Sequence, residues 1–244
     1  MRKHLLCFSV AFLCLCATLP ACAAPGAAPT ALTQQEAERI LQDTFTIAGY
    51  VGLKGEANYA GKPQNIIAAA LFGAFDAKME YVFEQDRRKE QGEKPLPASA
   101  PLFTVNGRAL SPNQVRSRDD APALFKGLPE QYTTLVSREA VELAALRYTG
   151  HAVARHVAPD TGFFGDTILN DKGYFVCIDG LGDLPEEPRL TQVTPRGDGF
   201  TLSGEILQVM GDGEDDGPAR FRLELTPGDA PGTWKRQYTT MSGK

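Results

Sequence analysis

The chain has 244 residues, with 25 Lys and Arg against 30 Asp and Glu, and 43% of its residues are apolar. That apolar share is enough to close an ordinary core, which excludes a wholly disordered chain. The formal net charge of −5 argues against a nucleic-acid partner, because such proteins carry a basic stripe. After residue 22, no stretch is apolar over the roughly 20 residues that a membrane-spanning helix needs.

The N-terminus is typical of a bacterial secretory signal. Arg2, Lys3 and His4 precede an almost uncharged run over residues 5–24, as in the basic and apolar regions of such signals. We predict a signal peptide over residues 1–22, followed by a tether over residues 23–31. The tether is rich in Ala and Pro, which cannot bury enough surface to fold.

The sequence leaves two ends open for the signal peptide. Leu19-Pro20-Ala21-Cys22 is similar to a lipobox, in which Cys22 is lipidated and anchors the protein to a membrane, although Pro20 departs from the usual pattern. Ala21-Cys22-Ala23 instead offers the A-x-A site of plain secretion. The first interpretation predicts a membrane-anchored lipoprotein, and the second predicts a periplasmic or secreted protein.

Processing changes the charge and the cysteine content of the mature chain. Because the signal holds Arg2 and Lys3 but no acidic residue, its removal takes the formal net charge from −5 to −7. Of the cysteines, only Cys177 stays in the folded part, so we expect no internal disulfide. Cys177 falls in an apolar pattern over residues 174–178, where we expect a strand and a small buried side chain.

The first half of the mature chain carries helix signals. Thr33 and Glu36 form a capping box ahead of a helix predicted over residues 34–48, which ends near Gly49. A second helix is expected to begin at Pro63 and to end in the mixed-charge segment 84–94. The later signals are a hairpin turned by Asn106-Gly107, a short helix over residues 121–125, and a third helix from Pro129 or Ser137 to Tyr148, ended by Gly150.

The second half of the chain alternates short apolar runs with turns. Residues 167–169 and 174–178 flank a turn and indicate a hairpin, and Phe221, Leu223 and Leu225 alternate with polar residues. We therefore predict an α+β fold in a single domain over residues 32–244. Its N-terminal helices, in the part 32–150, are expected to pack on a curved antiparallel C-terminal sheet built by a β-meander over residues 166–240. The further strands are expected over residues 190–193, 200–210, 219–225 and 233–238.

Few residues indicate chemistry. His151 and His156 are spaced for neither a shared helix face nor an HExxH frame, and the chain has no G-x-S-x-G elbow. We therefore predict no catalytic residues and no cofactor. The acidic turn over residues 212–217 copies the first half of a calcium loop and then departs from it. Its Asp212, Glu214 and Asp216 are weak metal candidates, and with Asp215 they form an acidic rim that could steer a basic partner.

Four segments of the chain carry a likeness to a known group of proteins: residues 32–41, 128–130, 197–202 and 232–236, the last of which is a Gly-x-Trp-Lys strand. In these segments the chain resembles small secreted or lipid-anchored bacterial domains of cystatin-like or NTF2-like fold. One branch of these resembles inhibitors of peptidoglycan DL-endopeptidases. In such folds this strand often closes the meander with its Trp under the sheet. The resemblance implies an envelope domain that binds a protein, for example a cell-wall hydrolase.

Two functions follow from these observations. The first is a non-catalytic binding domain of the cell envelope, attached to a membrane through Cys22 and contacting another envelope protein. The second is an NTF2-like pocket that binds or converts a small molecule, which requires polar groups converging in a cleft. Tyr50, Asp76, Glu80 and His151 are the residues whose convergence on one apolar pocket would favour it.

Overall fold

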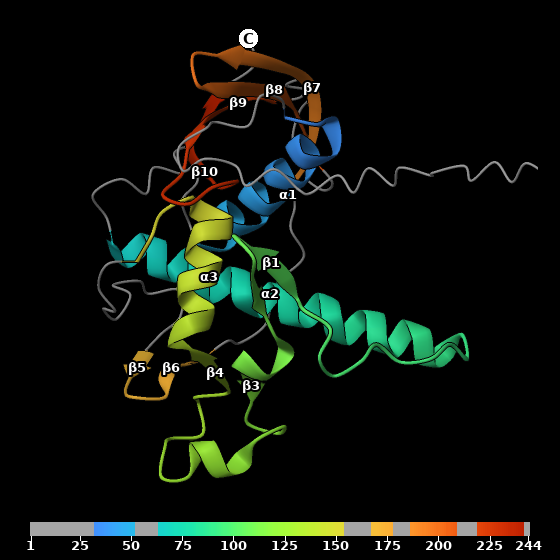
Figure 1. Cartoon of the computed structure of the whole chain (residues 1–244), viewed down its shortest axis with the longest axis vertical. Helices are drawn as coiled ribbons and strands as arrows, with labels where there is room; N and C mark the ends of the chain where they lie inside the picture. Colours follow the sequence, from blue (N-terminus) through green and yellow to red (C-terminus); the bar gives the residue numbers. More distant parts are fainter. Residues whose placement is uncertain (1–31, 52–62, 154–166, 178–185, 209–218, 242–244) are drawn as a thin grey trace, which may run out of the picture.

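The computed structural model of the chain describes residues 32–51, 63–153, 167–177, 186–208 and 219–241. Its helices are α1 (Gln34–Val51), α2 (Pro63–Glu90) and α3 (Arg138–Thr149), together with two single-turn 3-10 helices, Pro112–Gln114 and Pro122–Phe125. The three α-helices cross in the middle of the molecule, and antiparallel sheets lie at its two ends (Figure 1). The predicted α+β class is confirmed.

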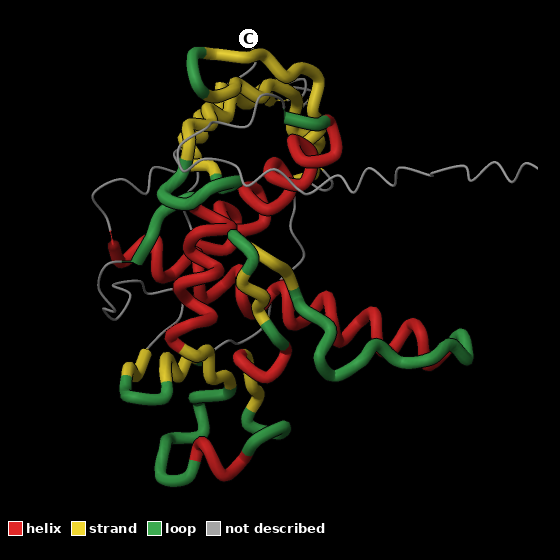
Figure 2. Tube along the Cα trace, viewed as in Figure 1, coloured by secondary structure: helices red, strands yellow, loops and turns green. Residues whose placement is uncertain are grey.

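The strands form two four-stranded sheets and one hairpin. The C-terminal sheet contains β7 (Glu186–Arg196), β8 (Gly199–Gln208), β9 (Ala219–Pro227) and β10 (Trp234–Met241), in the order β10-β9-β8-β7. The second sheet contains β3 (Val115–Ser117), β4 (Thr134–Ser137), β5 (Thr167–Leu169) and β6 (Gly173–Val176), in the order β3-β4-β6-β5. The hairpin joins β1 (Phe103–Val105) and β2 (Arg108–Leu110). Figure 2 shows the two larger sheets on opposite sides of the helices.

Helix α1 lies against the C-terminal sheet, as predicted. Its capping box is present: Thr33 Oγ1 accepts a 3.2 Å hydrogen bond from the Glu36 backbone, and Glu36 Oε2 accepts one of 3.1 Å from the Thr33 backbone. The buried face includes Phe45, whose ring meets Phe221 of β9 edge-on at 5.2 Å. The helix runs past Gly49 to Val51, two or three residues further than the sequence indicated.

Helix α2 corrects the expected layering. The prediction placed the N-terminal helices together on the C-terminal sheet, but α2 packs mainly on α3, on α1 and on strands of the second sheet. It approaches α3 at Gly73, where an added Cβ would overlap the ring of Tyr148. The cause is composition: the first half of α2 is apolar all round and buried, so it needs neighbours on every side.

The meander predicted over residues 166–240 is divided between two sheets. The four strands β7 to β10 form it as expected, whereas the hairpin of β5 and β6 pairs with β4 in the second sheet. Strand β4 ends at Ser137, whose hydroxyl accepts a 3.1 Å hydrogen bond from the Ala140 backbone and caps α3. Because strand and helix adjoin with no turn between them, β4 had no separate signal in the sequence.

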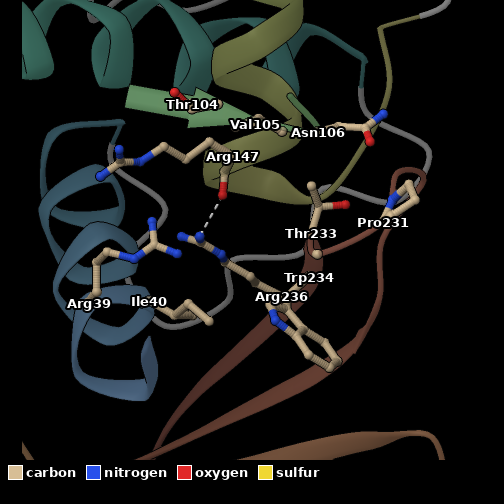
Figure 3. A pocket seen from close by; sticks show the side chains of 11 residues that line it. Arg39, Ile40, Thr104, Val105, Asn106, Arg147, Pro231, Thr233, Trp234 and Arg236 are labelled. Carbon is tan, nitrogen blue, oxygen red and sulfur yellow. Dashed lines mark hydrogen bonds between the residues drawn. The ribbon is translucent and has the colours of Figure 1, made fainter. Parts of the chain in front are cut away.

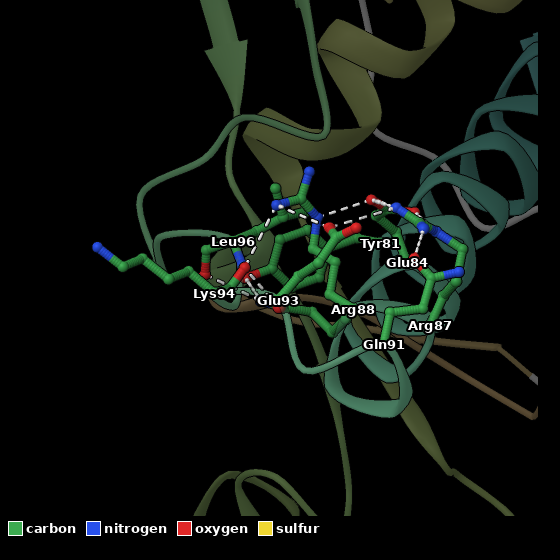
Figure 4. A network of polar contacts seen from close by, with 9 residues as sticks. Tyr81, Glu84, Arg87, Arg88, Gln91, Glu93, Lys94 and Leu96 are labelled. Carbon is green, nitrogen blue, oxygen red and sulfur yellow. Dashed lines mark hydrogen bonds and ion pairs between the residues drawn. The ribbon is translucent and has the colours of Figure 1, made fainter.

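The charged second half of α2 extends away from the body of the molecule (Figure 1). The segment after it folds back along the helix and is fastened by polar contacts, most of them drawn in Figure 4. Gln85 Oε1 accepts a 2.8 Å hydrogen bond from the Leu96 backbone, and Gln85 Nε2 donates one of 3.0 Å to the Leu96 carbonyl. Arg88 Nη1 donates a 3.3 Å hydrogen bond to the Lys94 carbonyl and lies 3.9 Å from the Glu93 carboxylate, while Glu84 pairs with Arg87 and Arg88 within the helix. The described helices include none with the length and apolarity of a membrane span.

Candidate functional site

A pocket of about 150 Å³ opens where α1, α3, the β1–β2 hairpin and β10 meet (Figure 3). Its cationic lining consists of Arg39 from α1, Arg147 from α3 and Arg236 from β10. The remaining lining is apolar or neutral: Ile40, Thr104, Val105, Asn106, Pro231, Gly232, Thr233 and Trp234. Residues far apart in the sequence therefore converge here.

Arg236 is the most deeply placed of the three arginines. It is only 4% exposed, because β10 turns Trp234 and Arg236 to the same inner side. Its Nη1 donates a 3.1 Å hydrogen bond to Thr44 Oγ1, and its Nη2 donates one of 2.7 Å to the main-chain carbonyl of Arg147. This side chain thereby ties the last strand to α1 and to the last turn of α3.

One carboxylate, Asp43 of α1, is the counter-ion for all three arginines. Its Oδ1 lies 3.4 Å from Arg147 Nη2, and its Oδ2 lies 3.9 Å from Arg236 Nη2 and 3.7 Å from Arg39 Nη1. Among the described residues, Asp43 Oδ2 and Arg147 Nε are buried with no hydrogen-bond partner. The immediate cluster therefore has three positive charges against one negative charge.

The guanidinium of Arg147 is held in place by aromatic rings. Its central carbon lies 4.6 Å from the ring centroid of Phe103 and 4.9 Å from that of Tyr148, both within the range of cation–π attraction. The two rings meet edge-on at 5.7 Å. Because Phe103 comes from β1, the hairpin both lines the pocket and fixes the position of Arg147.

Two carboxyls of α2 act on Arg147 from outside the pocket lining. Burial raises the pKa of Asp76 to about 6, with Glu80 and Asp43 adding to the shift and Arg147 opposing it. Partial burial also raises the pKa of Glu80, against the opposing charge of Arg147. Burial raises the pKa of the Tyr148 phenol as well, so this ring stays neutral. The carboxyls of Asp76 and Glu80 therefore reduce the positive charge around Arg147, although neither residue lines the pocket.

The wall between α3 and β10 is fixed by backbone contacts. Gly150 ends α3 in the left-handed conformation, with φ of 72°, and its carbonyl accepts a 2.8 Å hydrogen bond from the Asp229 backbone. Asp229 Oδ2 in turn accepts one of 2.8 Å from the Ala152 backbone, and its carboxylate pairs with Lys235. The turn before β10 is therefore locked to the end of α3.

His151 contributes to these contacts between the end of α3 and the turn before β10, and it does not line the pocket. Its Nδ1 lies 3.9 Å from Asp229 Oδ2, and burial together with nearby Lys235 lowers the pKa of its imidazole. Asp76 and Glu80 likewise lie outside the lining, and the side chain of Tyr50 is outside the described residues. None of the described residues proposed for a pocket from the sequence lines this one.

The other predicted sites are mostly outside the described residues. Cys22, His156 and the acidic turn with Asp212, Glu214, Asp215 and Asp216 all fall there. Cys177 directly follows β6 and is partly exposed, so the prediction of a buried strand residue was wrong. Within the described ranges, no group of three or more His, Cys, Asp or Glu side chains is placed to hold a metal ion.

The arginine pocket itself was missed by sequence reasoning. One signal was present: Trp234 and Arg236 are two residues apart in a predicted strand, which places a cation on the buried face of the sheet. A buried arginine needs an anionic partner, and that need points to Asp43 in a helix already predicted. The contribution of α3 had no comparable signal.

Chemically, the pocket is suited to holding an anion. Guanidinium groups stay charged at any physiological pH and offer paired donors that match a carboxylate or phosphate. No family model, no curated protein and no solved structure matches this chain. The resemblance to cystatin-like and NTF2-like envelope domains stays a prediction, and any functional argument has to rest on the geometry of the pocket.

Proposed function

We propose that this chain is an exported, non-catalytic binding protein that holds an anionic group of its ligand in the arginine pocket. The observation that carries the proposal is the set of three guanidinium groups around the single carboxylate of Asp43. Clustered like charges repel one another, so three arginines at one small pocket favour a second anion. The proposal thus combines the two functions considered from the sequence: a pocket that binds a ligand, in a protein that does not convert it.

The lining supports binding over catalysis. It contains arginines, hydroxyls, one carboxamide and apolar side chains, with no carboxyl, imidazole or thiol among its members. An arginine cannot act as a general base, because its guanidinium keeps its proton at any physiological pH. The closest carboxylate, Asp43, is already bound to three cations. A nucleophile or proton acceptor would therefore have to come from the ligand itself.

Isothermal titration calorimetry of the purified protein tests this function, with sodium acetate and sodium phosphate as probes. We expect at least one anion to bind and Arg39→Gln to weaken its affinity about tenfold or more, as the loss of a charge-assisted contact predicts. Arg39 suits the test because its side chain is 49% exposed, which makes it the most accessible of the three arginines. Arg189→Gln, an exposed arginine of β7, is the control and should bind normally. If neither anion binds, the proposal is wrong.

Membrane attachment is a separate part of the proposal. Cys22 is proposed as a lipidation site that places the binding domain at the cell envelope, where a cell-wall hydrolase or another envelope protein is the proposed partner. Fractionation of cells expressing Cys22→Ser tests the anchor, which should release the protein from the membrane fraction. An unchanged distribution would show that the anchor is absent and would leave plain secretion.

A further inference from the structure

Resting on the proposed function, we infer that the ligand is a monocarboxylate with a small apolar body, and not a phosphate. The free C-terminus of a peptide and a short carboxylic acid share this chemistry. Both present one negative charge, two oxygens in the plane of a guanidinium and an alkyl group next to them. The inference depends on the charge around the pocket, on its apolar wall and on its size.

The charge around the pocket matches one negative charge better than two. Three arginines against Asp43 alone leave two positive charges, and the carboxyls of Asp76 and Glu80 of α2, which both act on Arg147, bring the surplus at the pocket below two. Arg147 also lies in the last turn of α3, where the helix dipole is negative and disfavours anions. A phosphate monoester or free phosphate carries close to two charges at pH 7, whereas a carboxylate carries one.

Apolar side chains form part of the pocket wall and lie beside the cations: Ile40 follows Arg39 in α1, and Trp234 is two residues from Arg236 in β10. Ile40, Val105, Pro231 and Trp234 contribute to the lining, and the Trp234 ring packs edge-on against Phe200 at 5.4 Å. A phosphate is hydrated on all sides and gains nothing from such a wall, whereas an alkyl group next to a carboxylate is removed from water there. The wall therefore selects for an apolar body on the anion.

The size of the pocket limits that body. A cavity of about 150 Å³ holds a ligand about the size of benzene, or roughly six heavy atoms. A carboxylate with an alanine-sized body fits this space. Asn106, in the turn of the hairpin with φ of 49°, also contributes to the lining.

The test compares four probes by calorimetry on the purified protein at pH 7.5: N-acetyl-alanyl-alanine, its C-terminal amide, propionate and inorganic phosphate. We expect the free acid to bind at least tenfold more tightly than the amide and more tightly than phosphate. Tighter binding of the dipeptide than of propionate identifies a peptide C-terminus as the source, and equal binding identifies a short free acid. Phosphate binding above both carboxylates overturns this inference and leaves the proposed function intact, while no binding of any anion overturns both.

A charge variant tests the same inference on the protein side. Asp43→Asn removes one negative charge from the cluster and so raises its cationic surplus by one, and the ratio of phosphate to carboxylate affinity should rise about tenfold. Glu38→Gln, an exposed acid of the same helix, is the control and should leave the ratio unchanged. An unchanged ratio in a folded Asp43→Asn protein overturns the charge argument. Should Asp43→Asn fail to fold, the comparison of probes on the unmodified protein decides alone.

Discussion

The side chain of Arg236 in the last strand donates a 2.7 Å hydrogen bond to the main-chain carbonyl of Arg147 in the last turn of α3. This contact satisfies a carbonyl at a helix end and holds a buried cation close to Asp43. We expect Arg236→Met, which keeps a similar length, to lower the free energy of unfolding by about 2–4 kcal/mol. Urea unfolding followed by circular dichroism measures the change.

Arg222→Met is the matched control for this substitution. Arg222 lies in the neighbouring strand β9, but its side chain is 44% exposed and pairs with Glu224 at the surface. Its loss should cost less than about 1 kcal/mol, as for other exposed ion pairs. Equal losses in the two variants would mean that Arg236 does not connect the elements as described.

Gly150 should tolerate no larger residue. Its φ of 72° is left-handed, and an added Cβ would overlap the main chain of Trp234 and Lys235. Gly92 has a similar φ of 69°, yet a Cβ there meets nothing within 4 Å. We expect Gly92→Ala to cost about 1 kcal/mol from backbone strain alone and Gly150→Ala about 3 kcal/mol, in urea unfolding. Similar losses would show that the close approach of β10 to α3 is not rigid.

The parts of the fold that were predictable are those with local signals. Thr33 and Glu36 fixed the start of α1 by their own hydrogen bonds. Asn106 and Gly107 adopt φ of 49° and 73°, as the turn of the β1–β2 hairpin requires. Alternation in β9 correctly predicted that Leu223 and Leu225 share a buried face, and Leu223 pairs across the sheet with Leu202 of β8. Each signal needs only a few neighbouring residues.

The parts that were not predictable depend on distant contacts. Strand β3 has three residues and exists because it pairs with β4, which in turn pairs with β6. The pocket needs Arg39, Arg147 and Arg236 together, and only the fold of α1, α3 and β10 brings them there. The spacing of residues along the sequence does not indicate contacts between such distant elements. The pocket could therefore be identified only from the tertiary structure.

Asp76 should make stability depend on pH between about 4 and 6. Its pKa is about 6 in the folded protein against an ordinary value of 3.8, so the folded state holds the proton more tightly than the unfolded state. The stabilisation linked to this group is therefore full below about pH 4 and is lost as the pH rises to 6. The native protein should therefore lose about 1–2 kcal/mol of unfolding free energy between pH 4.5 and pH 7.5 through this group. Asp76→Asn should not show this loss, so its stability relative to the native protein should be higher at pH 7.5 than at pH 4.5 by that amount. Urea unfolding at both pH values measures the difference, and Asp86→Asn, an exposed Asp on the same helix, should show none.

Gln85 should determine whether the segment after α2 stays against the helix. Its carboxamide makes two hydrogen bonds with the main chain of Leu96, of 2.8 Å and 3.0 Å, and a third of 2.7 Å with Tyr81 Oη. Gln85→Ala removes all three, which at about 1 kcal/mol for each bond to Leu96 should accelerate hydrogen exchange at the Leu96 amide about tenfold or more. Gln91→Ala, which removes a contact with Arg87, is the control and should leave that amide protected.

Because this end of α2 extends away from the core, global unfolding should change little in either variant. Exchange at Leu96 that stays slow in Gln85→Ala would show that the contacts of Arg88 with Glu93 and with the Lys94 carbonyl hold the segment without it.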